Sequence, residues 1–193
     1  SFLSSLLDKD KSASFKTAHE VLSKASKSTA IDFSALTKDN LGYCVVLMTG
    51  SPESFGKRLI SALHEKAIEI WGSRKGKKPE ILQILSHYQA QDESPNFTEI
   101  IESIELLQQA LLKAGFKGIL LAIDELGKFL EYEARHSGTN NIYLLQGLAE
   151  LALANHPVKF AVVVMLHQSI EQYATGLGAT LKNEWAKVQG RFE

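Results

Sequence analysis

Three runs of apolar residues predict three buried strands, and they lie at 44–48 (CVVLM), 119–123 (ILLAI) and 158–166 (VKFAVVVML), the last interrupted only by Lys159. Unbroken apolar runs of this length are typical of strands buried on both faces of a parallel sheet. The segments between them repeat apolar positions at three and four residues, as expected of helices that cross from one parallel strand to the next. The chain is therefore predicted to be α/β, with a mostly parallel sheet sandwiched by helices in three layers.

The same periodicity predicts the helices. The helix after the first strand is expected to start at Pro52 and to end before Gly72. Later helices are predicted over residues 79–89, from Thr98 to Gly115, from Leu126 to a polar loop at 136–141, and along an apolar stripe that includes Leu145, Leu148 and Ala149.

One domain is predicted over residues 1–193, because this length suffices for a full core. Two segments are expected at its margin: a peripheral helical segment at 9–41, with Ala18, Val21 and Leu22 on one face, and a loop and helical insertion at 72–98. Residue 1 is Ser and not Met, which suggests a processed product, a trimmed sequence or a fragment of a larger protein.

Composition limits the classes of function. A net charge of -1 argues against strong attraction of the whole domain to nucleic acid or anionic membranes, and the short basic run at 74–78 is interpreted as a solvated loop. Cys44 is the single cysteine, so no disulfide framework or cysteine metal site is expected. With no membrane span or signal peptide pattern, a cytoplasmic location and no membrane partner are predicted.

Candidate chemistry follows the second apolar run, where Asp124 and Glu125 stand at the predicted carboxyl edge of the sheet. Open α/β sheets bind ligands at this edge. Magnesium needs only one or two carboxylates, so Asp124 is a suitable ligand, while Glu125 points elsewhere and can position a water molecule. The alternative is structural: Asp124 caps the next helix, and Glu125 favours its positive end.

The segment GILLAIDELGKFLEY, residues 118–132, resembles the Walker B segment of P-loop ATPases. The resemblance implies ATP and Mg²⁺ as ligands. It also implies that Asp124 holds the metal through water and that Glu125 orients the attacking water.

Two further roles are implied by resemblance to the additional-strand class of P-loop ATPases, which includes AAA+ proteins. His167 or Gln168, after the third apolar run, corresponds to the sensor that contacts the γ-phosphate or the water. Arg191 corresponds to an arginine finger acting on a neighbouring subunit, which implies self-association. The alternatives are a histidine bonded to backbone groups and an arginine at a helix terminus.

A phosphate-binding loop is not predicted within the chain. Gly50, Gly56 and Lys57 imitate one, but five residues separate the glycines where the motif has four, and Arg58 stands where it needs Ser or Thr. The Walker A loop is expected before residue 1, because SFLSSLL at 1–7 looks like the continuation of the helix that follows such a loop.

The leading hypothesis is an ATPase core that drives an unknown process in a larger protein with a DNA or protein partner. The segments DELGKFLEY and NEWAKVQGRFE look like parts of large bacterial ATP-binding proteins, some associated with defence against foreign DNA. A non-catalytic α/β interaction module is the alternative. A metal-dependent nuclease ranks last, because the other strand ends carry Thr49-Gly50 and His167-Gln168 and not further carboxylates.

Overall fold

The computed structural model describes residues 13–30, 42–91, 93, 95–136, 140–154, 157–167 and 190–192. Its elements, in chain order, are α2 (Ala13–Ala25), β1 (Tyr43–Thr49), α4 (Phe55–Trp71), α5 (Glu80–Ala90), α6 (Phe97–Lys113), β2 (Gly118–Asp124), α7 (Leu126–His136), α8 (Asn140–Leu153) and β3 (Lys159–Val164). The predicted α/β class is confirmed.

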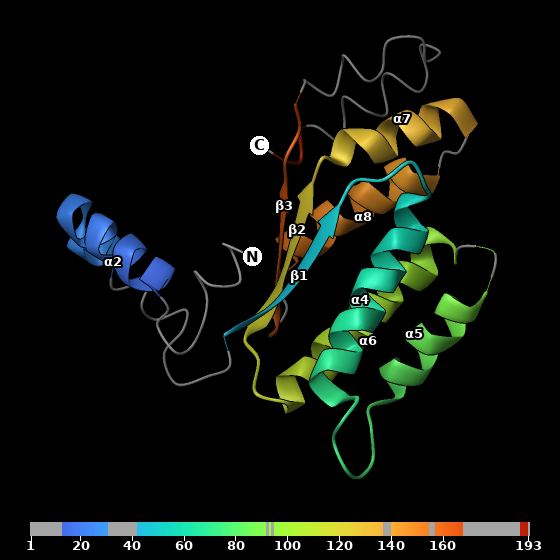
Figure 1. Ribbon diagram of the computed structural model, residues 1–193, viewed down its shortest axis with the longest axis horizontal. Coiled ribbons are helices and arrows are strands. Elements are labelled where there is room, and N and C mark those ends of the chain that lie inside the picture. Colours follow the sequence, from blue (N-terminus) through green and yellow to red (C-terminus); the bar gives the residue numbers. More distant parts are fainter. Residues whose placement is uncertain are drawn as a thin grey trace.

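The three strands form one parallel sheet in the order β1-β2-β3. Helices α4, α6 and α8 lie on one side of this sheet, α5 lies outside α4 and α6, and α2 lies on the other side (Figure 1). Each connection between neighbouring strands is helical, as expected for parallel pairs. All three strands therefore end at the same edge of the sheet.

The core lies between the sheet and the helices. Alternate residues of β1 and β2 point into it, namely Cys44, Val46, Met48, Ile119, Leu121 and Ile123, each at most 3% exposed. They meet the buried stripe of α4, which includes Phe55, Leu59 and Leu63 as the periodicity predicted. The expected insertion is part of the same core, because Ile81 and Leu85 of α5 belong to the cluster.

The opposite face of the sheet is apolar but less covered. β2 is buried nearly throughout, in agreement with the prediction, whereas Leu47 of β1 is 38% exposed and Val163 of β3 is 45% exposed. Burial on both faces is therefore confirmed only for the central strand. The outer strands have one neighbouring strand each in the described sheet, which gives their side chains less cover.

Several predicted boundaries were wrong. Helix α4 begins at Phe55 and not at Pro52, because residues 51–53 form a turn in which the amide of Glu53 donates to the carbonyl of Ser51. Strand β3 is shorter than the apolar run, and His136 belongs to α7. Among the α2 side chains whose burial is described, Phe15 is the buried one, whereas Val21 on the predicted apolar face is 60% exposed.

Among the described residues, no helix combines the length and the apolar character that crossing a membrane requires.

Candidate functional site at the carboxyl edge of the sheet

The ends of all three strands are joined by backbone hydrogen bonds. The amide of Gly50, just after β1, donates to the carbonyl of Asp124 over 2.8 Å. On the other side, the amide of Met165 donates to Ile123 over 2.9 Å, and Leu126 donates back to Met165 over 3.2 Å. Backbone hydrogen bonds thus continue past the strand ends. They bring the segments that carry Gly50, Glu125 and His167 to one edge of the sheet.

Glu125 has a left-handed backbone conformation, with φ of 54°. It is the only non-glycine residue with positive φ in the described part of the chain. For an L-residue this conformation costs roughly 1–2 kcal/mol, so the surroundings must hold it in place. Residues kept in such conformations cluster at functional sites, which makes Glu125 a candidate on backbone geometry alone.

Gly50 packs directly against the backbone of Glu125. A β-carbon at position 50 would lie 2.0 Å from the carbonyl oxygen of Glu125 and 2.9 Å from its carbonyl carbon. Only glycine permits so close an approach between the two segments. The glycine after β1 is therefore required for the close packing of the two strand ends.

The carboxylate of Glu125 contacts two basic side chains. Lys128, in the first turn of α7, places its Nζ 2.6 Å from Oε2, and His167 places its Nε2 3.5 Å from Oε1. The hydrogen bond from Lys128 is the main cause that lowers the pKa of Glu125, burial opposes it, and the charge of Lys128 and the contact with His167 lower it further. Glu125 is consequently an anion at neutral pH, with a side chain 27% exposed.

Asp124 stands beside Glu125 but faces differently. Its register partner is Thr49, and both side chains are exposed on the sheet face away from the core. Within the described residues the Asp124 carboxylate has no hydrogen-bond or ion-pair partner. The Glu125 carboxylate is thus anchored by Lys128 and the Asp124 carboxylate is open, although the two residues are adjacent in sequence.

The remaining predicted site residues are not all brought together. His167 is at the site, and Gln168 lies outside the described residues. Arg191 forms an ion pair with Glu150 of α8, with Nη1 to Oε1 at 3.1 Å. That pair is within one chain, so the role of Arg191 toward a neighbouring subunit stays a prediction.

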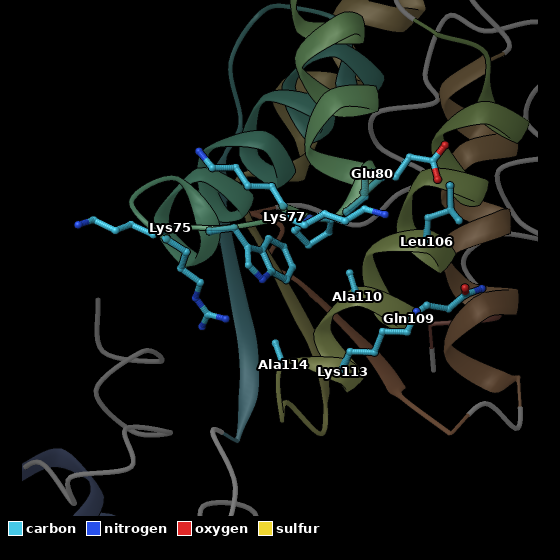
Figure 2. Close-up of a pocket in the computed structure, with 13 residues that line it drawn as sticks. Lys75, Lys77, Glu80, Leu106, Gln109, Ala110, Lys113 and Ala114 are labelled. Atoms are coloured by element: carbon cyan, nitrogen blue, oxygen red, sulfur yellow. The ribbon is translucent and has the colours of Figure 1, made fainter.

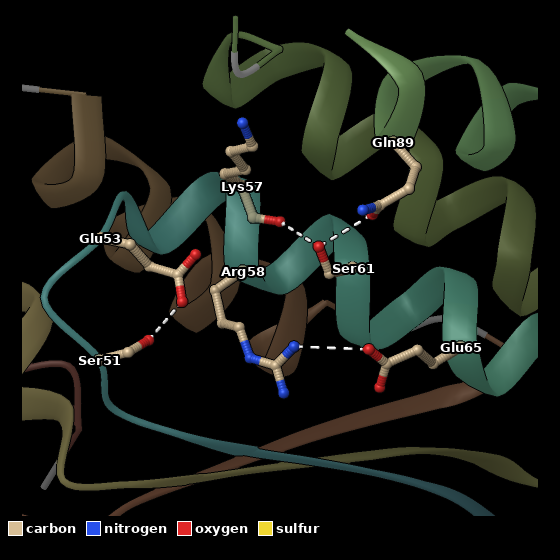
Figure 3. A network of polar contacts seen from close by, with 7 residues as sticks. All are labelled: Ser51, Glu53, Lys57, Arg58, Ser61, Glu65 and Gln89. Atoms are coloured by element: carbon tan, nitrogen blue, oxygen red, sulfur yellow. Dashed lines mark hydrogen bonds and ion pairs between the residues drawn. The ribbon is translucent and has the colours of Figure 1, made fainter. Parts of the chain in front are cut away.

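The turn between β1 and α4 does not present free cations to a phosphate. Figure 3 shows the hydroxyl of Ser51 donating to the carboxylate of Glu53, which adds negative charge to this turn. Arg58 is directed to Glu65, with Nη1 3.5 Å from Oε1. Gly56 is buried within the first turn of α4.

Two residues of the site were missed by the sequence analysis. Lys128 carries a usable signal, since it follows Glu125 by three residues at a helix start, where such pairs face each other. Gly50 was considered only as part of a sequence that imitates a phosphate-binding loop. Its contact with Glu125 depends on the distance between two strand ends, for which a single sequence gives no signal.

No group of three or more His, Cys, Asp or Glu side chains in the described residues is arranged to hold a metal ion. A cleft lies at the opposite end of the helices, lined by residues within 71–81 and 106–114, so it is separate from the Asp124-Glu125 edge.

Comparisons of the chain with protein-family models, curated proteins and solved structures give no match.

Proposed function

We propose that the carboxyl edge of the sheet is part of a magnesium-dependent ATP-hydrolysing site in a P-loop ATPase of the additional-strand class. One observation carries the proposal: Asp124 ends the central strand, and Glu125 directly after it is anchored in a left-handed conformation beside a histidine that follows the next strand. The resemblance of residues 118–132 to a Walker B segment agrees with this arrangement.

In this proposal Asp124 is the residue that binds magnesium, through water. Its donor chemistry fits, because the metal prefers oxygen ligands and keeps most of its waters beside a phosphate. The carboxylate is exposed on a rigid strand end and is not engaged by other described side chains. Bound magnesium would neutralise charge that develops on the phosphate oxygens.

Glu125 accepts a hydrogen bond from the attacking water. Its carboxylate is ionised because Lys128 donates to Oε2. Among the described residues, the other oxygen, Oε1, has only the longer contact of 3.5 Å to His167, so it has capacity to accept from water. A lowered pKa makes Glu125 a weak base, and its proposed contribution is therefore orientation of the water more than removal of its proton.

His167 is the proposed sensor, with Gln168 as its alternative. The imidazole is 75% exposed and adjoins Oε1 of Glu125, which places it beside the same water. A ring nitrogen can donate to a phosphate oxygen or to the water. ATP and magnesium are thus the proposed ligands, and the process that hydrolysis drives, DNA-related or defensive, is proposed by resemblance alone.

The test measures magnesium-dependent ATP hydrolysis by the full-length protein that contains residues 1–193. Glu125→Gln keeps the side chain's shape and is expected to lower turnover at least about 100-fold while nucleotide binding persists. His167→Ala should also lower turnover more than binding. Glu131→Gln, at an exposed position of α7, is the matched control and should leave hydrolysis unchanged.

A non-catalytic α/β module is the second candidate. It is favoured by the 2.6 Å contact between Lys128 and Glu125, which by itself is a sufficient structural role for this carboxylate. If the full-length protein neither binds nor hydrolyses ATP, the ATPase proposal is wrong and this candidate stands. Turnover that survives Glu125→Gln would remove Glu125 from the proposed mechanism.

A further inference from the structure

A basic cleft lies at the end of the helices opposite the Asp124-Glu125 edge. Its volume is about 520 Å³, and it is lined by the loop between α4 and α5 and by the last two turns of α6 (Figure 2). Five lining residues are cations, and Glu80 is the only carboxylate among the lining residues; the cations are Arg74, Lys75, Lys77, Lys78 and Lys113. This concentration contrasts with the net charge of -1 for the whole chain.

The negative carboxyl ends of α4 and α6 balance only part of the positive charge at this cleft. Lys78 donates to the carbonyl of Gly72 at the end of α4 over 2.8 Å, and Lys113 lies in the last turn of α6. Each helix carboxyl end carries about half a negative charge, so two ends offset about one of the four net positive charges. Within the described residues, the side chains of Arg74, Lys75, Lys77 and Lys113 have no hydrogen-bond or ion-pair partner.

The cations form an exposed strip and not an enclosed pocket. Arg74, Lys75, Lys77 and Lys113 are all exposed, and Lys75 extends from the loop away from α6 (Figure 2). Lys113 joins this strip from α6, a connection the sequence does not show, because it lies far along the chain from the basic loop. An open strip of this kind suits an extended polyanion better than a small enclosed anion.

The residue types suit contacts with phosphate groups. Four of the five cations are lysines, whose ammonium groups bind phosphates as point charges without a required orientation. Trp71 lines the cleft but is only 3% exposed, so it offers no aromatic surface on which a base could stack. Contacts to the backbone of a nucleic acid need neither stacking nor base edges.

We propose that this cleft binds the phosphate backbone of a nucleic acid, with Lys75, Lys77 and Lys113 on the phosphates and without recognition of base sequence. The site is independent of the ATP-hydrolysing edge, so either proposal can fail without the other. This proposal replaces the interpretation of residues 74–78 as a solvated loop. The reason is that Lys113 of α6 lines the same cleft as these residues.

The test is fluorescence anisotropy of a labelled 20-base-pair DNA duplex titrated with the protein, for two unrelated sequences of equal length. Both duplexes should bind with the same affinity. With three phosphates neutralised, the affinity should fall about 40-fold between 50 and 200 mM salt, from a log–log slope of about −0.9 per phosphate.

The variant Lys75→Gln/Lys77→Gln/Lys113→Gln should weaken binding at 50 mM salt at least about tenfold and reduce the salt slope by about three. Its matched control is Lys16→Gln/Lys24→Gln/Lys27→Gln, which removes the same charge from exposed positions in residues 13–30 and should bind like the unmodified protein. Circular dichroism before each titration verifies that both variants are folded.

Three results would overturn the proposal. The first is that the duplex does not bind at 50 mM salt. The second is that the two triple variants lose the same affinity for the duplex. The third is that poly-glutamate displaces the labelled duplex as effectively as unlabelled DNA does. The last result would assign the cleft to an acidic protein segment.

Discussion

Gly50 and Glu125 are in contact so close that no side chain fits at position 50: a β-carbon there would lie 2.0 Å from the Glu125 carbonyl oxygen. This contact connects the end of β1 to the residue after β2. Glu125 has a left-handed backbone at this contact, and its carboxylate contacts Lys128 and His167. The first prediction follows from it.

Gly50→Ala should destabilise the protein by about 1–3 kcal/mol, because the added methyl group must push two backbone segments apart. The measurement is urea unfolding followed by circular dichroism. Gly147→Ala in α8 is the control, since its β-carbon would meet only side-chain atoms of Ile101, at 3.1 Å. Equal stability of the Gly50→Ala variant and the unmodified protein would show that the contact is not tight in solution.

The second prediction concerns the ion pair between Lys128 and Glu125. Glu125 has a lowered pKa in the folded state, so its contribution to the free energy of unfolding is present above its ordinary pKa of 4.5 and is lost as the pH falls through the lowered value. Lys128→Gln removes the main cause of the shift. The pKa of Glu125, followed by carbon NMR of its carboxyl group, should therefore rise.

Lys128→Arg is the matched variant, because it keeps the positive charge and should keep the pKa of Glu125 low. The stability difference between the Lys128→Gln variant and the unmodified protein should be largest above pH 5 and should shrink in acid, where Glu125 is protonated in both. A pKa of Glu125 that is the same in all three proteins would contradict this account of the site.

Much of the sheet could be predicted, because buried strands of a parallel sheet appear in the sequence as runs of apolar residues. The runs at 44–48 and 119–123 lie within β1 and β2, and the edge shared by Asp124, Glu125 and His167 follows from their parallel order. The third run predicted too long a strand, because apolar residues at 165 and 166 continue beyond the ladder.

Features that depend on tertiary contacts were not predictable. The buried face of α2 was assigned from periodicity, yet Phe15 is 4% exposed and Val21 is 60% exposed. Burial is decided by what packs against a helix, and spacing alone does not contain that information. The Gly50–Glu125 contact was missed for the same reason.

The third prediction concerns the start of α6, which the sequence analysis placed at Thr98. The structure instead places Asn96 at the N-cap, where its side chain accepts from the amide of Glu99 over 3.0 Å and the Glu99 side chain accepts from the amide of Asn96 over 2.8 Å. Asn96→Ala should cost about 1 kcal/mol of stability, because it leaves an amide of the first turn without its acceptor.

Thr98→Ala distinguishes the two assignments of the helix start. Thr98 lies inside the first turn and is exposed, so this substitution should change the midpoint of urea unfolding much less than Asn96→Ala. If Thr98→Ala lowered the midpoint more than Asn96→Ala, the helix would instead start at Thr98, as the periodicity predicted.

The last prediction uses Cys44, the single cysteine of the chain, as a probe of the core beneath the sheet. Its side chain is 2% exposed, and burial raises the pKa of the thiol to about 12. The thiolate is the form that reacts, so at pH 8 only on the order of one thiol in ten thousand is ionised in the folded protein. Alkylation by iodoacetamide should consequently be at least about 100-fold slower in the folded protein than in concentrated guanidinium chloride. Cys44→Ala is the blank, and it should take up no label in either condition. Labelling of the folded protein at the rate of an unfolded thiol would mean that β1 separates from α4 readily, and the rigid edge proposed for Asp124 and Glu125 would then lack its support.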